Sequence, residues 1–71
     1  MMFTRSLERD QHTRRYTIRA HRDQGWEVLA EQDGQVTSET RYHDWHRVER
    51  ARQLVDREIA RLQDGGWKER N

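Results

Sequence analysis

The sequence contains no cysteine and no proline, and it has no long hydrophobic run. Without cysteine there can be no disulfide, no thiol nucleophile and no thiolate metal ligand. Without proline, no prolyl isomerisation step can slow folding. No window approaches the roughly 18 apolar residues of a membrane helix, and the opening MMFTRSLERD lacks the apolar run of a signal peptide. We therefore expect a cytoplasmic protein with no membrane segment.

Hydrophobic residues are also scarce, at 31% against 38% charged residues. Such polarity is typical of disordered chains. However, the net charge is only +1, and three Trp and two Tyr supply large apolar surfaces. A chain of 71 residues can form one domain, whose single core contributes only a few kcal/mol of net stability. We expect one small folded domain to which oligomerisation would add stability.

Apolar residues recur at helical spacing over about residues 44–64. Counted at 100° per residue, they form one narrow stripe: Val48, Ala51, Val55, Ile59 and Leu62. Asp44 is suited to cap the start of this helix. Gly65 and Gly66 are suited to end it, with Trp67 folding back onto the last turn. We predict one amphipathic helix.

Upstream of the helix the apolar period changes to two, which is typical of half-buried strands. This pattern predicts three strands, over about residues 14–22, 26–32 and 35–42. We predict an α+β fold, a three-stranded antiparallel meander covered on one face by the single C-terminal helix. Residues 1–13 are expected to be a flexible, mostly disordered tail, residues 14–67 a single βββα domain, and residues 68–71 a flexible end.

The two breaks between these strands read Asp-Gln-Gly and Gln-Asp-Gly, at residues 23–25 and 32–34. Glycine in third place favours a three-residue turn with a bulge. Such turns place Arg22 opposite Trp26, and Ala30 opposite Val36, so that the apolar residues share one face. A tight two-residue turn at the second break would instead expel Val36 from the core.

The predicted register sets His21, Glu27 and Glu39 side by side on the solvent face of the sheet. An imidazole with two carboxylates can bind a metal or carry out acid–base chemistry. An open sheet face, however, has no pocket that excludes water. Arg19 and Arg41 also lie within diagonal reach, where they would neutralise the carboxylates. We interpret this row as a solvated surface.

His43 and His46 flank the predicted helix start, at a spacing that suits two ligands on one side of a helical turn. A helix N-terminus disfavours added positive charge, so capping and packing are the favoured roles of this segment. We predict no catalytic, cofactor-binding or metal site, and no small-molecule substrate.

Arginines line one flank of the helix, and two leucines are predicted to be exposed, Leu29 on the sheet and Leu54 within the arginine flank. A basic stripe can track a phosphate backbone. The helix as a whole is neutral, however, because its arginines are matched by acidic residues. The candidate interaction surface comprises Arg15, Arg19, Leu29, Arg47, Arg50, Leu54, Arg57 and Arg61.

Charge is uneven along the chain. Residues 1–22 hold six arginines against Glu8 and Asp10, a balance of +4, whereas residues 23–43 hold one arginine against five acidic residues, a balance of −4. In the predicted meander the first strand is an unpaired, basic edge, which is a natural place for pairing with another chain. We expect a protein-interaction module or homo-oligomer, with a homodimer favoured and nucleic-acid binding as the alternative.

The predicted order of three strands and a helix is similar to the DNA-binding modules of phage-type integrases and to the core of double-stranded RNA-binding domains. Those RNA-binding domains have a lysine-rich start to their second helix. Here the helix begins DWHRVER, and Glu27, Glu31 and Glu39 lie on the sheet face. No family motif is matched, so the architecture carries no functional expectation.

Overall fold

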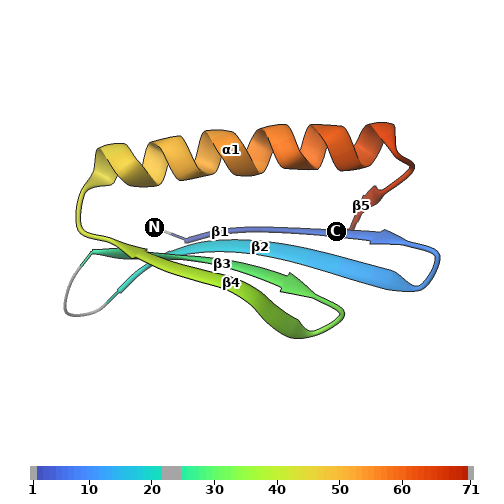
Figure 1. The fold of residues 1–71 in the computed structure, drawn as a ribbon, viewed down its shortest axis with the longest axis horizontal. Helices are drawn as coiled ribbons and strands as arrows, with labels where there is room; N and C mark the ends of the chain where they lie inside the picture. Colours follow the sequence, from blue (N-terminus) through green and yellow to red (C-terminus); the bar gives the residue numbers. More distant parts are fainter. Residues whose placement is uncertain (1, 22–24, 71) are drawn as a thin grey trace.

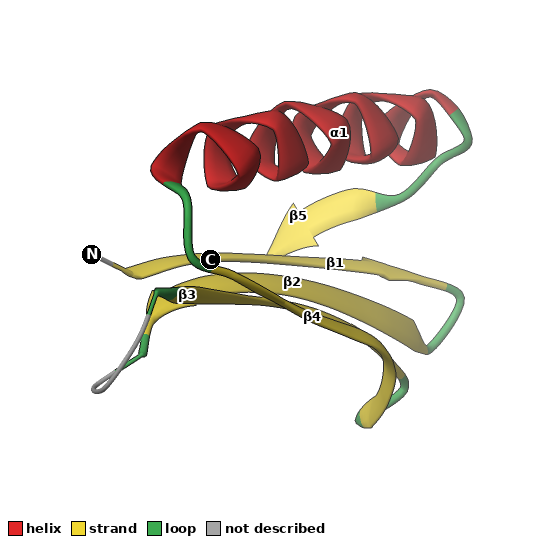
Figure 2. Ribbon diagram, turned by 60° about the vertical axis from the view of Figure 1, so that its left-hand side comes forward, coloured by secondary structure: helices red, strands yellow, loops and turns green. Residues whose placement is uncertain are grey.

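The computed structural model describes residues 2–21 and 25–70, and it has an α+β fold with one antiparallel sheet and one helix. Five strands lie in the order β4-β3-β2-β1-β5, and helix α1 crosses one face of this sheet (Figures 1 and 2). The elements are β1 (Met2–Arg9), β2 (His12–Ala20), β3 (Trp26–Gln32), β4 (Gln35–Tyr42), α1 (Trp45–Asp64) and β5 (Lys68–Arg70). The predicted class and the helix-covered sheet are confirmed, whereas the prediction of three strands is wrong.

Strand β1 occupies most of the segment for which the sequence predicted a disordered tail. It pairs with β2 along its whole length. Leu7, in the second half of β1, is 0% exposed and packs against Tyr16 of β2 and Ile59 of α1. Burying a leucine side chain is worth about 1.5–3 kcal/mol, which explains why this segment is ordered.

The sequence signal for β1 is weak for two reasons. Phe3 and Leu7 are four residues apart, a spacing that fits one face of a helix as well as one face of a strand. The inward position between them is occupied by Arg5, which interrupts the apolar alternation. The hairpin to β2 turns through Asp10 and Gln11, both at positive φ (50° and 70°), without the glycine that usually marks such a turn.

Residues 68–70 form strand β5, so the prediction of a flexible end at residues 68–71 is wrong for these three residues. It pairs antiparallel with β1, with Arg70 opposite Ser6 and Lys68 opposite Glu8. The last strand of the chain, β5, therefore lies beside the first strand, β1, in the sheet.

The first predicted turn is longer than expected. Ala20 pairs with Trp26, so residues 21–25 connect β2 and β3, and the predicted pairing of Arg22 lies outside the described residues. Gly25 has φ +69°, and a Cβ there would stand 2.0 Å from the carbonyl oxygen of Tyr42. Only glycine fits this close approach of two strands.

The second predicted turn is wrong in form. Gln32 pairs with Gln35, so the turn is the tight one, with Asp33 and Gly34 at φ +52° and +82°. A bulge follows inside the strand, since Ala30 pairs with Ser38 while its neighbour Glu31 pairs with Val36. Val36 is therefore expelled and 55% exposed, as the tight turn demands.

The extra residue of this bulge is Thr37, and it reverses the parity of the strand. Beyond it, Ser38, Thr40 and Tyr42 lie on the helix-covered face, opposite Ala30, Val28 and Trp26. The predicted inward face of β4 is thus recovered after Val36.

Helix α1 agrees with its prediction in start, stripe and end. Asp44 caps it, accepting a hydrogen bond from the backbone N–H of His46 at 2.9 Å. The buried residues of the helix are the predicted ones, with Leu62 half-buried beside them: Val48, Ala51, Val55 and Ile59. At its start, Trp45 contacts Trp26 of β3, with ring centroids 5.2 Å apart.

The helix ends in a Schellman motif. Gly66, at φ +96°, donates its N–H to the carbonyl of Gln63, and Trp67 donates to that of Leu62 at 3.0 Å. Trp67 and Leu62 both pack against the main core cluster. The predicted return of Trp67 onto the last turn is confirmed, and it directs the chain into β5.

Candidate interaction surfaces

The residues predicted to form one interaction surface lie on two opposite sides of the molecule. Tyr16 and Ile18 of β2 are buried under the helix, so their neighbours in the strand point to the other face of the sheet. That open face carries Arg15, Arg19 and Leu29. The outer side of α1 carries Arg47, Arg50, Leu54, Arg57 and Arg61, all of them exposed. The single surface is therefore split by the thickness of the molecule (Figure 1).

Glu27 is the most buried charged residue of the open face, at 3% exposure. Its carboxylate accepts hydrogen bonds from Arg19 at 2.9 and 2.7 Å, and lies 3.5 Å from Nε of Arg41. The Arg19 guanidinium holds the pKa of the Glu27 carboxyl below its usual range. The cross-strand row is thus Arg19–Glu27–Arg41, because the register differs from the predicted one by two residues.

This row replaces the predicted row of His21, Glu27 and Glu39. Glu39 stands opposite Leu29, and Arg41 takes the expected place of Glu39 beside Glu27. An ionised carboxylate held between two guanidinium groups is a poor proton acceptor or metal ligand, because each of its two oxygens already faces a cation. The row has a net positive charge and fixes the side chains of three adjacent strands.

Leu29 is not an exposed leucine, in contrast to its prediction. It is 9% exposed, with Thr17 of β2 and Glu39 of β4 as its cross-strand neighbours. Thr17 is also buried, at 7%. The open face of the sheet thus has a small covered centre between rows of charged residues, and Leu29 offers little apolar surface to a partner.

The predicted edge strand is an interior strand. Strand β2 pairs with β3 on one side and with β1 on the other, so its backbone groups are occupied. The edges of the sheet are instead β4 on one side and, on the other, β5 together with residues 2–5 of β1, which extend beyond the pairing with β5. The basic charge of β2 therefore lies inside the sheet, and the acidic β3 separates it from the β4 edge.

Strand β4 is the long edge. It spans eight residues, each of them exposed except for the half-buried Tyr42. Between the bulge at Thr37 and the end of the strand, residues 38–42 pair regularly with β3. On the open face this regular stretch carries Glu39 and Arg41. Residues 35–42 are also the last strand, and hence an edge, of the predicted three-stranded meander.

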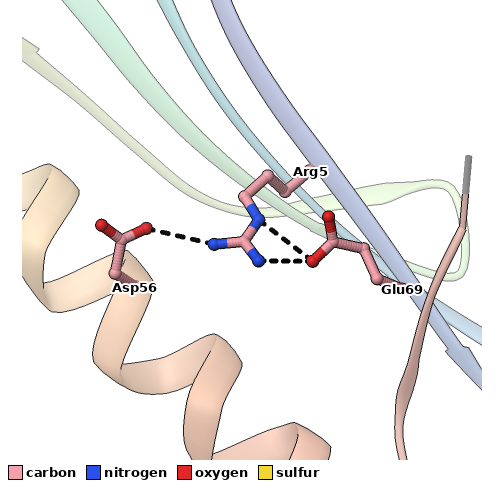
Figure 3. Close-up of polar contacts among 3 residues, drawn as sticks. All are labelled: Arg5, Asp56 and Glu69. Atoms are coloured by element: carbon pink, nitrogen blue, oxygen red, sulfur yellow. Dashed lines mark hydrogen bonds and ion pairs between the residues drawn. The ribbon is translucent and has the colours of Figure 1, made fainter.

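Strand β5 is a short edge of three charged residues. Arg5 of β1 links it to the helix: the Arg5 guanidinium binds Glu69 of β5 and lies 3.3 Å from the carboxylate of Asp56 (Figure 3). The hydrogen bond to Glu69 raises the pKa of Arg5 above its ordinary value. Short length and charge are the features by which natural sheets protect an edge from pairing.

The arginine flank of α1 is only partly engaged in ion pairs. Arg61 donates to Glu58 at 2.6 and 2.7 Å. Within residues 2–21 and 25–70, none of the ion pairs involves Arg47, Arg50 or Arg57. Leu54 lies between them and is 63% exposed, as predicted.

The histidines at the helix start do not converge with other ligands. His43 and His46 are both exposed, and Asp44 between them is occupied with capping. In the described part of the chain, no group of three His, Cys, Asp or Glu side chains is arranged to hold a metal ion. The capping role predicted for this segment is confirmed for Asp44.

Comparison with protein-family models, curated proteins and solved structures found no match. Among the described residues, no helix combines the length and the apolar character that crossing a membrane requires.

Proposed function

We propose that this protein is a small interaction module that forms a homodimer through the β4 edge. The observation that supports this proposal is the exposure of an eight-residue edge strand, with no other described strand on its outer side. An edge strand presents unpaired N–H and C=O groups, which form a template for another strand, and beyond the bulge at Thr37 this edge of β4 is regular over residues 38–42. Two copies joined edge to edge would give one continuous sheet.

The composition of β4 favours pairing. Its sequence QVTSETRY is rich in β-branched residues and contains neither the lysine nor the proline that commonly blunts an edge. Val36, at 55% exposure, adds apolar surface at the start of the strand. On the opposite side of the sheet, β5 is short and highly charged, and the outer edge of β1 is open only over residues 2–5, so β4 is the longer edge.

Sedimentation velocity, from micromolar to several hundred micromolar protein, tests this proposal. We expect a concentration-dependent monomer–dimer equilibrium. Thr40→Lys places a charge on the edge and should shift the equilibrium to monomer. Leu54→Lys introduces the same side chain on the outer face of the helix and should leave the dimer intact. A wild-type protein that stays monomeric, or a dimer disrupted by Leu54→Lys alone, would overturn the proposal.

Nucleic-acid binding through the outer face of α1 is the second candidate. It is favoured by the three arginines of that face that take no part in the ion pairs of the described chain, Arg47, Arg50 and Arg57. Acidic residues on the same helix, Glu49 and Asp56, oppose it. The arrangement is suited to weak contacts with a phosphate backbone.

Fluorescence anisotropy with labelled duplex and single-stranded DNA at low salt distinguishes the two candidates. Binding through this face would weaken steeply with salt, with a logarithmic slope of about −0.9 per phosphate contacted in duplex DNA. It would also be lost in Arg50→Glu. Absence of any anisotropy change at low salt would eliminate the nucleic-acid candidate.

A further inference from the structure

We propose that β4 pairs with β4 of a second copy in one register, centred on Thr40, in which Glu39 of each copy faces Arg41 of the other. This inference rests on the proposed homodimer and specifies how its two edges meet. It follows from the length of the regular stretch, from the symmetry of an antiparallel pair, and from the charges on the open face.

The regular part of β4 is bounded on both sides. The bulge at Thr37 interrupts the strand on one side, and the strand ends at Tyr42 on the other. The five residues between these limits, 38–42, have Thr40 as their midpoint. Only a register centred on Thr40 lets the whole regular stretch of one copy pair with the whole regular stretch of the other.

Symmetry restricts the choices further. Two identical strands that pair antiparallel are related by a two-fold axis perpendicular to the sheet, so both helices lie on the same side. Residues directly opposite each other then point to the same face. A register centred on Glu39 would set Glu39 against Glu39, and one centred on Arg41 would set Arg41 against Arg41. The register centred on Thr40 forms two Glu39–Arg41 pairs instead.

Both partners of this pair are available. Glu39 is exposed and takes part in none of the ion pairs within residues 2–21 and 25–70. The side chain of Arg41 is 57% exposed and uses its Nε for the 3.5 Å contact with Glu27. The other guanidinium N–H groups can receive a carboxylate from the neighbouring copy. Each incoming Glu39 would extend the Arg19–Glu27–Arg41 row into the second subunit.

The helix-covered face of the same register carries no charge. Thr40 stands against Thr40, and Ser38 stands against Tyr42 of the other copy. Cross-strand threonine pairs and aromatic residues are favourable neighbours in antiparallel sheets. Both faces of the paired β4 strands are therefore compatible with the register centred on Thr40.

The absence of cysteine from the chain allows a single-cysteine test. In the proposed register Thr40→Cys sets two β carbons opposite each other, roughly 4.5–5.5 Å apart. In a mixture of the Glu39→Cys and Arg41→Cys variants, a heterodimer places one cysteine from each variant opposite the other in the same way. Opposed positions alternate between hydrogen-bonded and non-hydrogen-bonded pairs, so one of the two tests samples each geometry. Under mild oxidation we expect a disulfide-linked species from at least one of them.

Ser38→Cys is the matched control, since its two copies would lie four residues apart, roughly 13 Å along the strand, beyond disulfide reach. Cross-linking of Ser38→Cys, or of Glu39→Cys alone, would overturn the register while leaving the homodimer in place. A dimer by sedimentation that cross-links at none of these positions would overturn it as well. A monomer by sedimentation would overturn both the register and the proposed function.

Charge reversal gives a second readout. Glu39→Arg replaces two opposite-charge pairs by two like-charge pairs, and we expect the dimer dissociation constant to rise by about tenfold or more. Glu31→Arg makes the same charge change on the adjacent strand β3 and should leave the dissociation constant nearly unchanged. Equal effects of the two variants would show that net charge, and not the register, controls association.

Discussion

The Asp33 side chain joins the two hairpins of the sheet. Its carboxylate accepts a hydrogen bond from the backbone N–H of Thr13 at 2.9 Å and lies 3.1 Å from Nδ1 of His12. The backbone N–H of Asp33 donates to the carbonyl of Thr13, also at 2.9 Å. The hydrogen bond from Thr13, followed by that with His12, lowers the pKa of Asp33 below its ordinary value.

A lowered pKa links this contact to the pH dependence of folding. The folded protein binds the Asp33 proton less tightly than the unfolded chain, so the stabilisation is present above the unfolded pKa of about 3.9 and is lost as the pH falls through the folded value. We expect Asp33→Asn to be less stable than wild type at neutral pH. Urea unfolding should show this gap shrinking below about pH 4. A gap that is constant from neutral to acid pH would contradict the assignment.

Among the elements, the helix and strands β2, β3 and β4 could be predicted from the sequence because apolar periodicity and the helix caps mark them, whereas the form of the turn between β3 and β4 was not predicted. Strand β1 could not, because Arg5 stands on its inward face and its turn through Asp10 and Gln11 lacks glycine. Strand β5 has no apolar residue at all, and it exists because Gly66 and Trp67 return the chain to the sheet.

Leu7→Ala tests the ordering of β1. Leu7 is fully buried, so truncating it should lower the free energy of unfolding by about 2–5 kcal/mol, as for other buried leucines. Leu54→Ala, at an exposed position of α1, is the matched control and should change stability by no more than about 0.5 kcal/mol. Chemical denaturation measures both. Similar stabilities of Leu7→Ala and wild type would mean that residues 2–9 do not contribute to the core.

Of the two edges of the predicted meander, only one is an edge of the molecule: residues 35–42 lie at the margin of the sheet as β4, whereas the first predicted strand is interior as β2. An edge is defined by which strands fail to find a neighbour, and that depends on the pairing of β1 with β2 and β5. The prediction of a single interaction surface was wrong because it also depended on strand pairing. In the observed register Arg41 lies beside Glu27, and neighbouring strands bury Leu29. The exposure of Leu54 was predicted correctly because it depends on helical periodicity alone.

Val55→Asp tests whether the molecule unfolds as one unit. Val55 is 8% exposed and belongs to the cluster shared by β1, β2 and α1, so an unpaired carboxylate there should abolish the cooperative thermal transition seen by circular dichroism. Leu54→Asp changes the adjacent, 63% exposed residue and should leave a folded protein. A cooperative transition in Val55→Asp would show that this cluster is not the common core.

The pairing of β1 with β5 brings the first and last strands together at the margin of the sheet farthest from β4. Three strands separate β5 from β4, so a fluorophore or immobilisation handle attached at either end of this chain would be carried on the side away from the long edge. The molecule can thus be labelled or tethered with the β4 edge still free, which makes the association measurements above practicable at a surface as well as in solution.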